Sequence, residues 1–187
     1  MTSTGMVHTI TREDIAQTHE RIAPYIRATP VLHLEAGAVA PVPVALKLEL
    51  LQHTGSFKAR GAFNTLLQEG LPKAGVAAAS GGNHGAAVAY AARVLGLRAR
   101  IFVPEISSPV KRRRIEAYGA QITVSGTSYA DALEACNAHV GASGATAIHA
   151  YDAAHTVAGQ ATLAREFEAQ AGDLDTLLVA VGGGGLI

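Results

Sequence analysis

The chain has 187 residues, 49% of them hydrophobic, with a formal net charge of zero and one cysteine. This length suits one large domain or two small ones, and the balanced charge argues against nucleic acid as a partner, because phosphate binding needs an excess of basic residues. One cysteine excludes an internal disulfide. The sequence has neither a signal peptide nor an apolar run of membrane-spanning length, so we expect a cytoplasmic protein without membrane contact.

The first part of the chain predicts a helix, a strand and a second helix. After a loose lead-in over residues 1–10, Thr11 can cap a helix whose apolar residues follow helical spacing until Pro24 ends it. Apolar and charged residues alternate over residues 42–50, which predicts a β-strand. The next helix is expected over residues 56–68.

From residue 75 onward, strand and helix patterns alternate. Strands are expected over residues 75–80, 99–103, 121–124, 145–149 and 176–181, and helices over 83–95, 108–118, 129–140 and 156–170. This alternation indicates α/β layers around a mostly parallel sheet. Ligands of such sheets bind beyond the carboxyl ends of the strands, where three glycine-rich motifs fall.

Two other features have structural interpretations. Cys136 shares a predicted helical face with Leu133 and Val140, which favours a small core residue over a catalytic thiol. The basic run over residues 111–114 opens a predicted helix without interleaved aromatic residues, so we interpret it as a solvated helix face.

The first motif, residues 54–61, places Lys58 at the expected start of a helix, after Phe57. Backbone N–H groups at a helix start create a positive potential that lowers the pKa of an amine and favours its neutral, nucleophilic form. The alternative is an ordinary surface lysine.

The second motif, residues 80–85, contains Ser80, Gly81, Asn83 and His84. Its glycines allow close approach of a ligand, and the following helix start offers N–H donors that suit a carboxylate. Asn83 can donate to a phenolate or carboxylate, or it can simply cap the helix. His84 can act as an acid or base, although a histidine at a helix end is more often structural.

The third motif consists of Gly182, Gly183, Gly184 and Gly185. Their N–H groups can cradle a phosphate. The pattern is neither GxGxxG nor GxxxxGK[ST], which argues against nucleoside triphosphate binding.

Together, GSFKARGAFN, SGGNHGAA and VGGGGL resemble the fold type II pyridoxal 5′-phosphate enzymes, and within them the threonine/serine dehydratase and serine racemase family. The resemblance extends from residue 28 to the last residue. It implies two open parallel-sheet α/β domains like those of the tryptophan synthase β chain. The larger would comprise residues 1–52 and 148–187 and would be incomplete, because family members continue well beyond the tetraglycine motif. The smaller would span residues 53–147.

The resemblance also implies a role for each motif. Lys58 would carry the pyridoxal phosphate covalently, Phe57 would pack beside its ring and Asn83 would bind the ring oxygen. The phosphate would lie on Gly182, Gly183, Gly184 and Gly185, and the substrate carboxylate on Ser80, Gly81, Asn83 and His84. No metal site is expected in the present chain.

The activity implied is β-elimination of L-threonine or L-serine to a 2-oxo acid and ammonia, by a homo-oligomer (dimer or tetramer). A racemase on the same scaffold is the alternative, weakened because Gly81 stands where serine racemases carry a proton-donating serine. Ala86 and Ala161 also depart from the family pattern, which leaves the substrate open. A third possibility is an inactive, truncated binding module, and we expect this chain alone to show little turnover.

Overall fold

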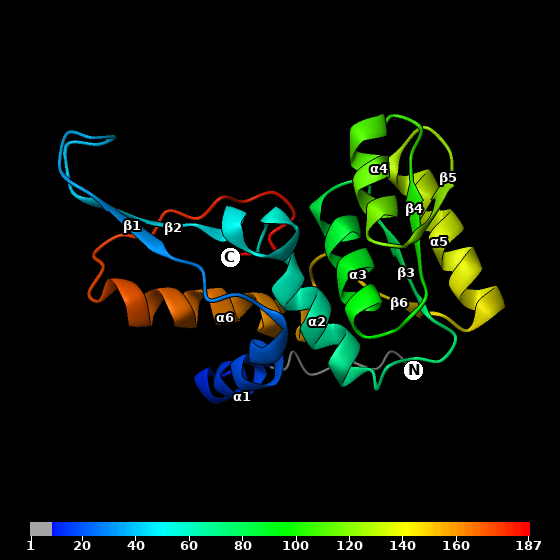
Figure 1. The fold of residues 1–187 in the computed structure, drawn as a ribbon, viewed down its shortest axis with the longest axis horizontal. Coiled ribbons are helices and arrows are strands. Elements are labelled where there is room, and N and C mark those ends of the chain that lie inside the picture. Colours follow the sequence, from blue (N-terminus) through cyan, green and yellow to red (C-terminus); the bar gives the residue numbers. More distant parts are fainter. Residues whose placement is uncertain (1–8) are drawn as a thin grey trace, which may run out of the picture.

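The computed structural model describes residues 9–187, so most of the lead-in expected over residues 1–10 lies outside the described residues. Six helices and six strands follow one another in the described part of the chain (Figure 1). The helices are α1 (Arg12–Ile22), α2 (Lys58–Gln68), α3 (Asn83–Val94), α4 (Pro109–Ala117), α5 (Tyr129–Ser143) and α6 (Ala154–Ala171). The strands are β1 (Val31–Leu34), β2 (Val44–Lys47), β3 (Val76–Ala79), β4 (Ala99–Val103), β5 (Gln121–Val124) and β6 (Thr146–Ala147).

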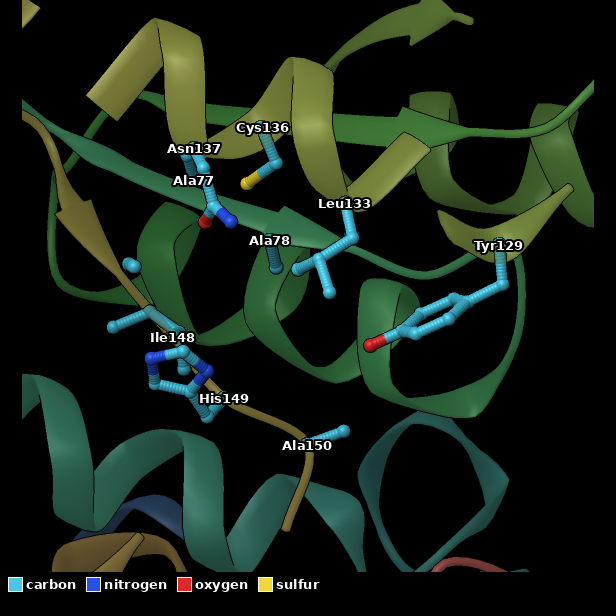
Figure 2. Close-up of a pocket in the computed structure, with 11 residues that line it drawn as sticks. Ala77, Ala78, Tyr129, Leu133, Cys136, Asn137, Ile148, His149 and Ala150 are labelled. Carbon is cyan, nitrogen blue, oxygen red and sulfur yellow. The ribbon is translucent and has the colours of Figure 1, made fainter. Parts of the chain in front are cut away.

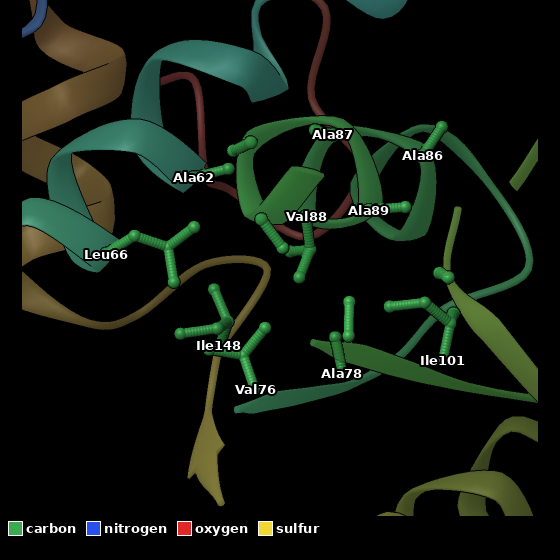
Figure 3. Packing of buried hydrophobic residues seen from close by; sticks show 14 of the residues in the cluster. Ala62, Leu66, Val76, Ala78, Ala86, Ala87, Val88, Ala89, Ile101 and Ile148 are labelled. Carbon is green, nitrogen blue, oxygen red and sulfur yellow. The ribbon is translucent and has the colours of Figure 1, made fainter. Parts of the chain in front are cut away.

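Four strands form a parallel sheet in the order β5-β4-β3-β6, which confirms the expected α/β architecture. Side chains alternate across this sheet, because successive residues of a strand point to opposite faces. Ala78 and Ile101 pack against the alanine-rich α3 on one face, as Figure 3 shows. Ala77 and Phe102 pack against α5 and Cys136 on the other face. The interpretation of Cys136 as a core residue is therefore confirmed.

The second sheet is an antiparallel ribbon of β1 and β2, and the sequence patterns did not predict β1. The strand expected over residues 42–50 is shorter, because two short turns, Glu49–Leu51 and His53–Gly55, bend the chain before α2 begins. Similarly, β6 covers two residues of the strand expected over residues 145–149. Among the described helices, none is both long enough and apolar enough to cross a membrane.

The strand expected over residues 176–181 is absent. This segment runs from the end of α6 back towards the start of α2 without pairing (Figure 1), and Leu178 is 92% exposed. Its apolar sequence favours a strand, but a strand needs a neighbouring backbone to satisfy its N–H and C=O groups. No described strand pairs with it to provide that ladder.

The interpretation of residues 111–114 as a solvated face is confirmed for the exposed Lys111, Arg113 and Arg114 and is wrong for the half-buried Arg112. The Arg112 guanidinium donates to the carbonyl oxygens of Pro104 and Glu105. The Arg114 guanidinium donates to the carbonyl oxygen of Thr54, in the turn that precedes α2. These carbonyls come from other loops, so helical spacing within α4 could not indicate them.

A buried ion network fixes α2 to its surroundings. Arg60, which has no exposed side-chain surface, donates to Glu49 at 2.7 Å and to Glu166 of α6 at 3.0 Å. Lys47 of β2 also donates to Glu166, at 2.5 Å, and the Thr29 N–H donates to it at 2.8 Å. Burial would raise the pKa of the Glu166 carboxyl, but hydrogen bonds from Arg60 and Lys47 lower it below its ordinary value. The network joins the ribbon, α2 and α6.

We expect Arg60→Ala to lower the free energy of unfolding by about 3–5 kcal/mol, because it leaves two carboxylates buried without their main partner. Chemical denaturation measures the change. The matched control is Arg12→Ala, whose ion pair with Glu168 is largely exposed and should contribute less than about 1 kcal/mol. Equal losses in the two variants would contradict a structural role for the buried network.

Candidate functional site

Lys58 begins α2 and points into the interior. The chain reaches it through a turn in which Thr54 has a φ of 60° and Gly55 a φ of 66°. Lys58 Nζ donates to the carbonyl oxygen of Ala150 at 2.6 Å and lies 5.0 Å from the centre of the Phe57 ring. Burial lowers the pKa of the Lys58 amine. The side chain is thus a partly desolvated amine held by one carbonyl, and not an ordinary surface lysine.

The tetraglycine segment lies beside the residues that receive Lys58. A Cβ on Gly183 would be 2.8 Å from ring atoms of Tyr151. A Cβ on Gly185 would lie 2.9 Å from Tyr151 Cβ and 3.0 Å from Gln160 Oε1. Around Gly182 and Gly184 the space is open. The loop therefore packs against Tyr151 with two of its residues and leaves two free to face a ligand.

The SGGNHG loop follows the carboxyl end of β3. The Ser80 N–H donates to the Phe102 carbonyl oxygen at 3.0 Å, which continues the ladder between β3 and β4. A Cβ on Gly81 would lie 2.1 Å from Ser107 Oγ, so a side chain there requires the neighbouring loop to move. The helix cap of α3 is Gly82, without a side-chain bond, and Asn83 is exposed in the first turn. The alternative that Asn83 acts as the helix cap is therefore wrong.

His84 is buried and is held by a backbone carbonyl. Its Nε2 lies 2.8 Å from the carbonyl oxygen of Ile148. Burial lowers the pKa of His84 to about 4, and the charges of Lys58 and His149 act in the same direction. His84 is thus neutral near pH 7. This geometry favours the structural interpretation of His84.

Residues 148–151 organise the site, and sequence patterns missed them. The carbonyl oxygens of Ile148 and Ala150 are hydrogen-bonded to His84 and Lys58, respectively, and the Tyr151 ring contacts the tetraglycine loop. A small hollow lies alongside, between α5 and residues 147–150; Figure 2 shows Tyr129, Leu133 and Cys136 among its lining residues. A backbone carbonyl leaves no trace in a sequence, so only the aromatic character of Tyr151 offered any signal.

Known proteins are similar to this chain in sequence and fold. The family model described as "Pyridoxal-phosphate dependent enzyme" matches residues 22–187. The catabolic L-threonine dehydratase of Staphylococcus aureus is 35% identical over 184 residues, which are 96% of this chain and 53% of that protein. Among solved structures, T.th. threonine deaminase has a TM-score of 0.86 and 40% identity over 94% of this chain and 58% of its own. Maize serine racemase has a TM-score of 0.88 and 33% identity, over 93% of this chain and 54% of the racemase chain.

The chain thus spans about half the length of the relatives it matches. The expected fold, that of the fold type II pyridoxal phosphate enzymes, is confirmed by these solved neighbours, and the cofactor expectation by the family. On the match over residues 22–187, the chain belongs to the family of pyridoxal-phosphate dependent enzymes.

Proposed function

We propose that this protein is a pyridoxal phosphate-dependent ammonia-lyase that converts L-threonine or L-serine to a 2-oxo acid and ammonia. The observation that carries the proposal is the position of Lys58, a partly desolvated amine that donates to the Ala150 carbonyl oxygen. Ala150 immediately precedes Tyr151, which contacts the tetraglycine loop. The similarity to threonine dehydratase and threonine deaminase supports the substrate class. We propose a homo-oligomer, and keep the domain division at residues 52 and 148, the second of which follows the end of β6.

The residues present suit the cofactor. An aldehyde needs a neutral amine, and burial of Lys58 shifts its amine in that direction. A phosphate dianion needs backbone N–H donors that it can approach closely, and the space around Gly182 and Gly184 is open. We propose that Lys58 holds the cofactor, that Phe57 packs beside its ring and that Asn83 binds its ring oxygen. Gly182, Gly183, Gly184 and Gly185 would bind its phosphate.

The substrate carboxylate would lie at the start of α3. Ser80, Gly81, Asn83 and His84 surround this helix start, where unpaired N–H groups and the helix dipole favour an anion. His84 would support the loop through its bond to Ile148 and remain uncharged. When bound, the cofactor supplies the electron sink for elimination. The Lys58 amine would act as the base that takes the α-proton.

The racemase alternative has one observation in its favour besides the similarity to maize serine racemase. Ser107 Oγ lies 2.1 Å from the position of a Cβ on Gly81, so its hydroxyl occupies part of the space of a side chain at residue 81. Racemisation needs a proton donor on the second face of the substrate. Ser107 is the candidate for that donor, whereas Gly81 has none to offer.

The test of the proposed function is the identity of the lysine that the cofactor modifies. Borohydride reduction after incubation with pyridoxal phosphate, followed by peptide mapping, should place the pyridoxyl group on Lys58. Lys47 is the matched control, because its ammonium is buried in bonds to Glu166, Gln170 and the Thr29 carbonyl. Absence of a visible absorbance band and of labelling at Lys58 would contradict the proposal and favour a binding module without catalytic function.

We expect L-serine to yield oxo acid and almost no D-serine, because Gly81 has no side chain to deliver a proton. Chiral chromatography of the reaction mixture, run beside an oxo-acid assay, measures both products. If D-serine dominates and Ser107→Ala abolishes it while oxo acid persists, the racemase alternative is correct and Ser107 is its donor.

The buried neutral His84 predicts a dependence of stability on pH. Its pKa of about 4 in the folded protein lies below the ordinary 6.5, so between these values the unfolded chain binds a proton that the folded one does not. Stability contributed by this group is present above pH 6.5 and falls by about 3 kcal/mol as pH drops towards 4. Denaturant titrations should show a shallower pH dependence for His84→Asn than for the wild type.

A further inference from the structure

We propose that Tyr151 is a positioning residue that holds the tetraglycine loop in the conformation that receives a phosphate group. This inference rests on the proposed function, since it concerns the phosphate end of the cofactor. It assigns to the loop a rigid support that comes from a segment about thirty residues earlier in the chain.

The contact between Tyr151 and the loop is too close for any side chain on two of the glycines. Ring atoms of Tyr151 lie 2.8 Å from the position of a Cβ on Gly183, and its own Cβ lies 2.9 Å from one on Gly185. Real Cβ contacts are longer, so Tyr151 approaches the backbone of the loop directly. Gly184, with a φ of 80° and open space around it, forms the turn between these two contacts. The ring of Tyr151 therefore contacts one side of this turn, and its Cβ contacts the other.

Gln160 supports the loop from the other side. Its side chain is 2% exposed, and its Oε1 is buried without a hydrogen-bond partner in the described part of the chain. That oxygen lies 3.0 Å from the position of a Cβ on Gly185, while Nε2 donates to the Ala150 carbonyl at 3.4 Å. An unpaired buried acceptor is unfavourable by about 1–3 kcal/mol. In this proposal, an N–H of the loop would donate to that oxygen when the phosphate binds.

The support is itself anchored. The Tyr151 ring lies near Tyr129 at the start of α5, where burial and the neighbouring Tyr151 raise the pKa of the Tyr129 hydroxyl. Asp152, with a φ of 56°, turns the chain sharply after Tyr151 and leads into α6. Ala150, the preceding residue, accepts the bond from Lys58 Nζ. One short turn therefore positions both the amine and the loop. It thereby sets the distance between the sites that would receive the aldehyde and the phosphate of one molecule.

This arrangement predicts an effect on phosphate recognition rather than on the amine. Pyridoxal has the aldehyde of the cofactor and lacks the phosphate, so it reports on Lys58 alone. We expect Tyr151→Ala to weaken pyridoxal phosphate binding by about tenfold or more, because the loop must then be ordered on binding. Pyridoxal binding should change by less than about twofold. The measurement is the ligand dependence of the visible absorbance band, with thermal melts to verify folding.

Two variants separate the ring from its hydroxyl. Tyr151→Phe keeps the contacts with Gly183 and Gly185, so it should keep most of the preference for the phosphorylated ligand. Tyr129→Phe is its matched control, because it removes the neighbouring hydroxyl on the α5 side. Equal losses for pyridoxal phosphate and pyridoxal in Tyr151→Ala would mean a general structural role and would overturn the inference.

A double-mutant cycle keeps the test decisive even if Tyr151→Ala is less stable. Gly183→Ala should weaken pyridoxal phosphate binding in the wild-type background, where its Cβ meets the ring, and should have little effect together with Tyr151→Ala. Additive effects would overturn the inference. If pyridoxal phosphate and pyridoxal reacted equally well with Lys58 of the wild-type protein, the inference about Tyr151 would be refuted, whereas the proposed role of Lys58 would stand. Binding of neither ligand would refute the proposed function itself.

Discussion

The buried network around Arg60 is the interaction on which the position of the site depends. Its guanidinium bridges Glu49, which follows the β-ribbon, and Glu166, in α6, and no part of its side chain is exposed. Burial of charged groups is costly unless each has partners, and here Lys47 and Thr29 complete the set. Such a network tolerates few alternative geometries. This network fixes the position of α2 along its axis. It therefore also fixes the direction of Lys58, which lies half a turn before Arg60.

Close packing between glycines brings the remaining parts together. A Cβ on Gly61 would lie 2.9 Å from the Thr156 carbonyl oxygen, and one on Gly159 would lie 2.6 Å from the Arg60 carbonyl oxygen. Helices α2 and α6 therefore approach each other closely where they meet. Because α6 begins directly after residues 148–153, the close approach of α2 and α6 places Ala150 next to the Lys58 amine. The small residues thus have a positional function as well as a packing one.

The electrostatics of the site follow from the same burial. Backbone carbonyls of residues 148–150 accept bonds from Lys58 and His84, and burial lowers the pKa of both side chains. Two basic groups near each other therefore shift towards their neutral forms without a carboxylate in direct contact. That environment suits the roles proposed for Lys58, a nucleophile and a base. In the proposed site, the donors for an anion are backbone N–H groups at the start of α3 and on the glycine loop.

The sequence by itself determined the α/β class, the parallel sheet and the family, because strand and helix periods and the three motifs are local properties. Cys136 in the core and the boundaries of α3 and β4 also follow from local patterns. The tertiary structure alone decided that residues 176–181 are unpaired, since a strand depends on a neighbour that its own residues cannot indicate. It also decided that Arg114 binds the Thr54 carbonyl and that Tyr151 meets the tetraglycine loop. These contacts join segments distant in the chain through backbone atoms, which every residue type shares and no sequence pattern distinguishes.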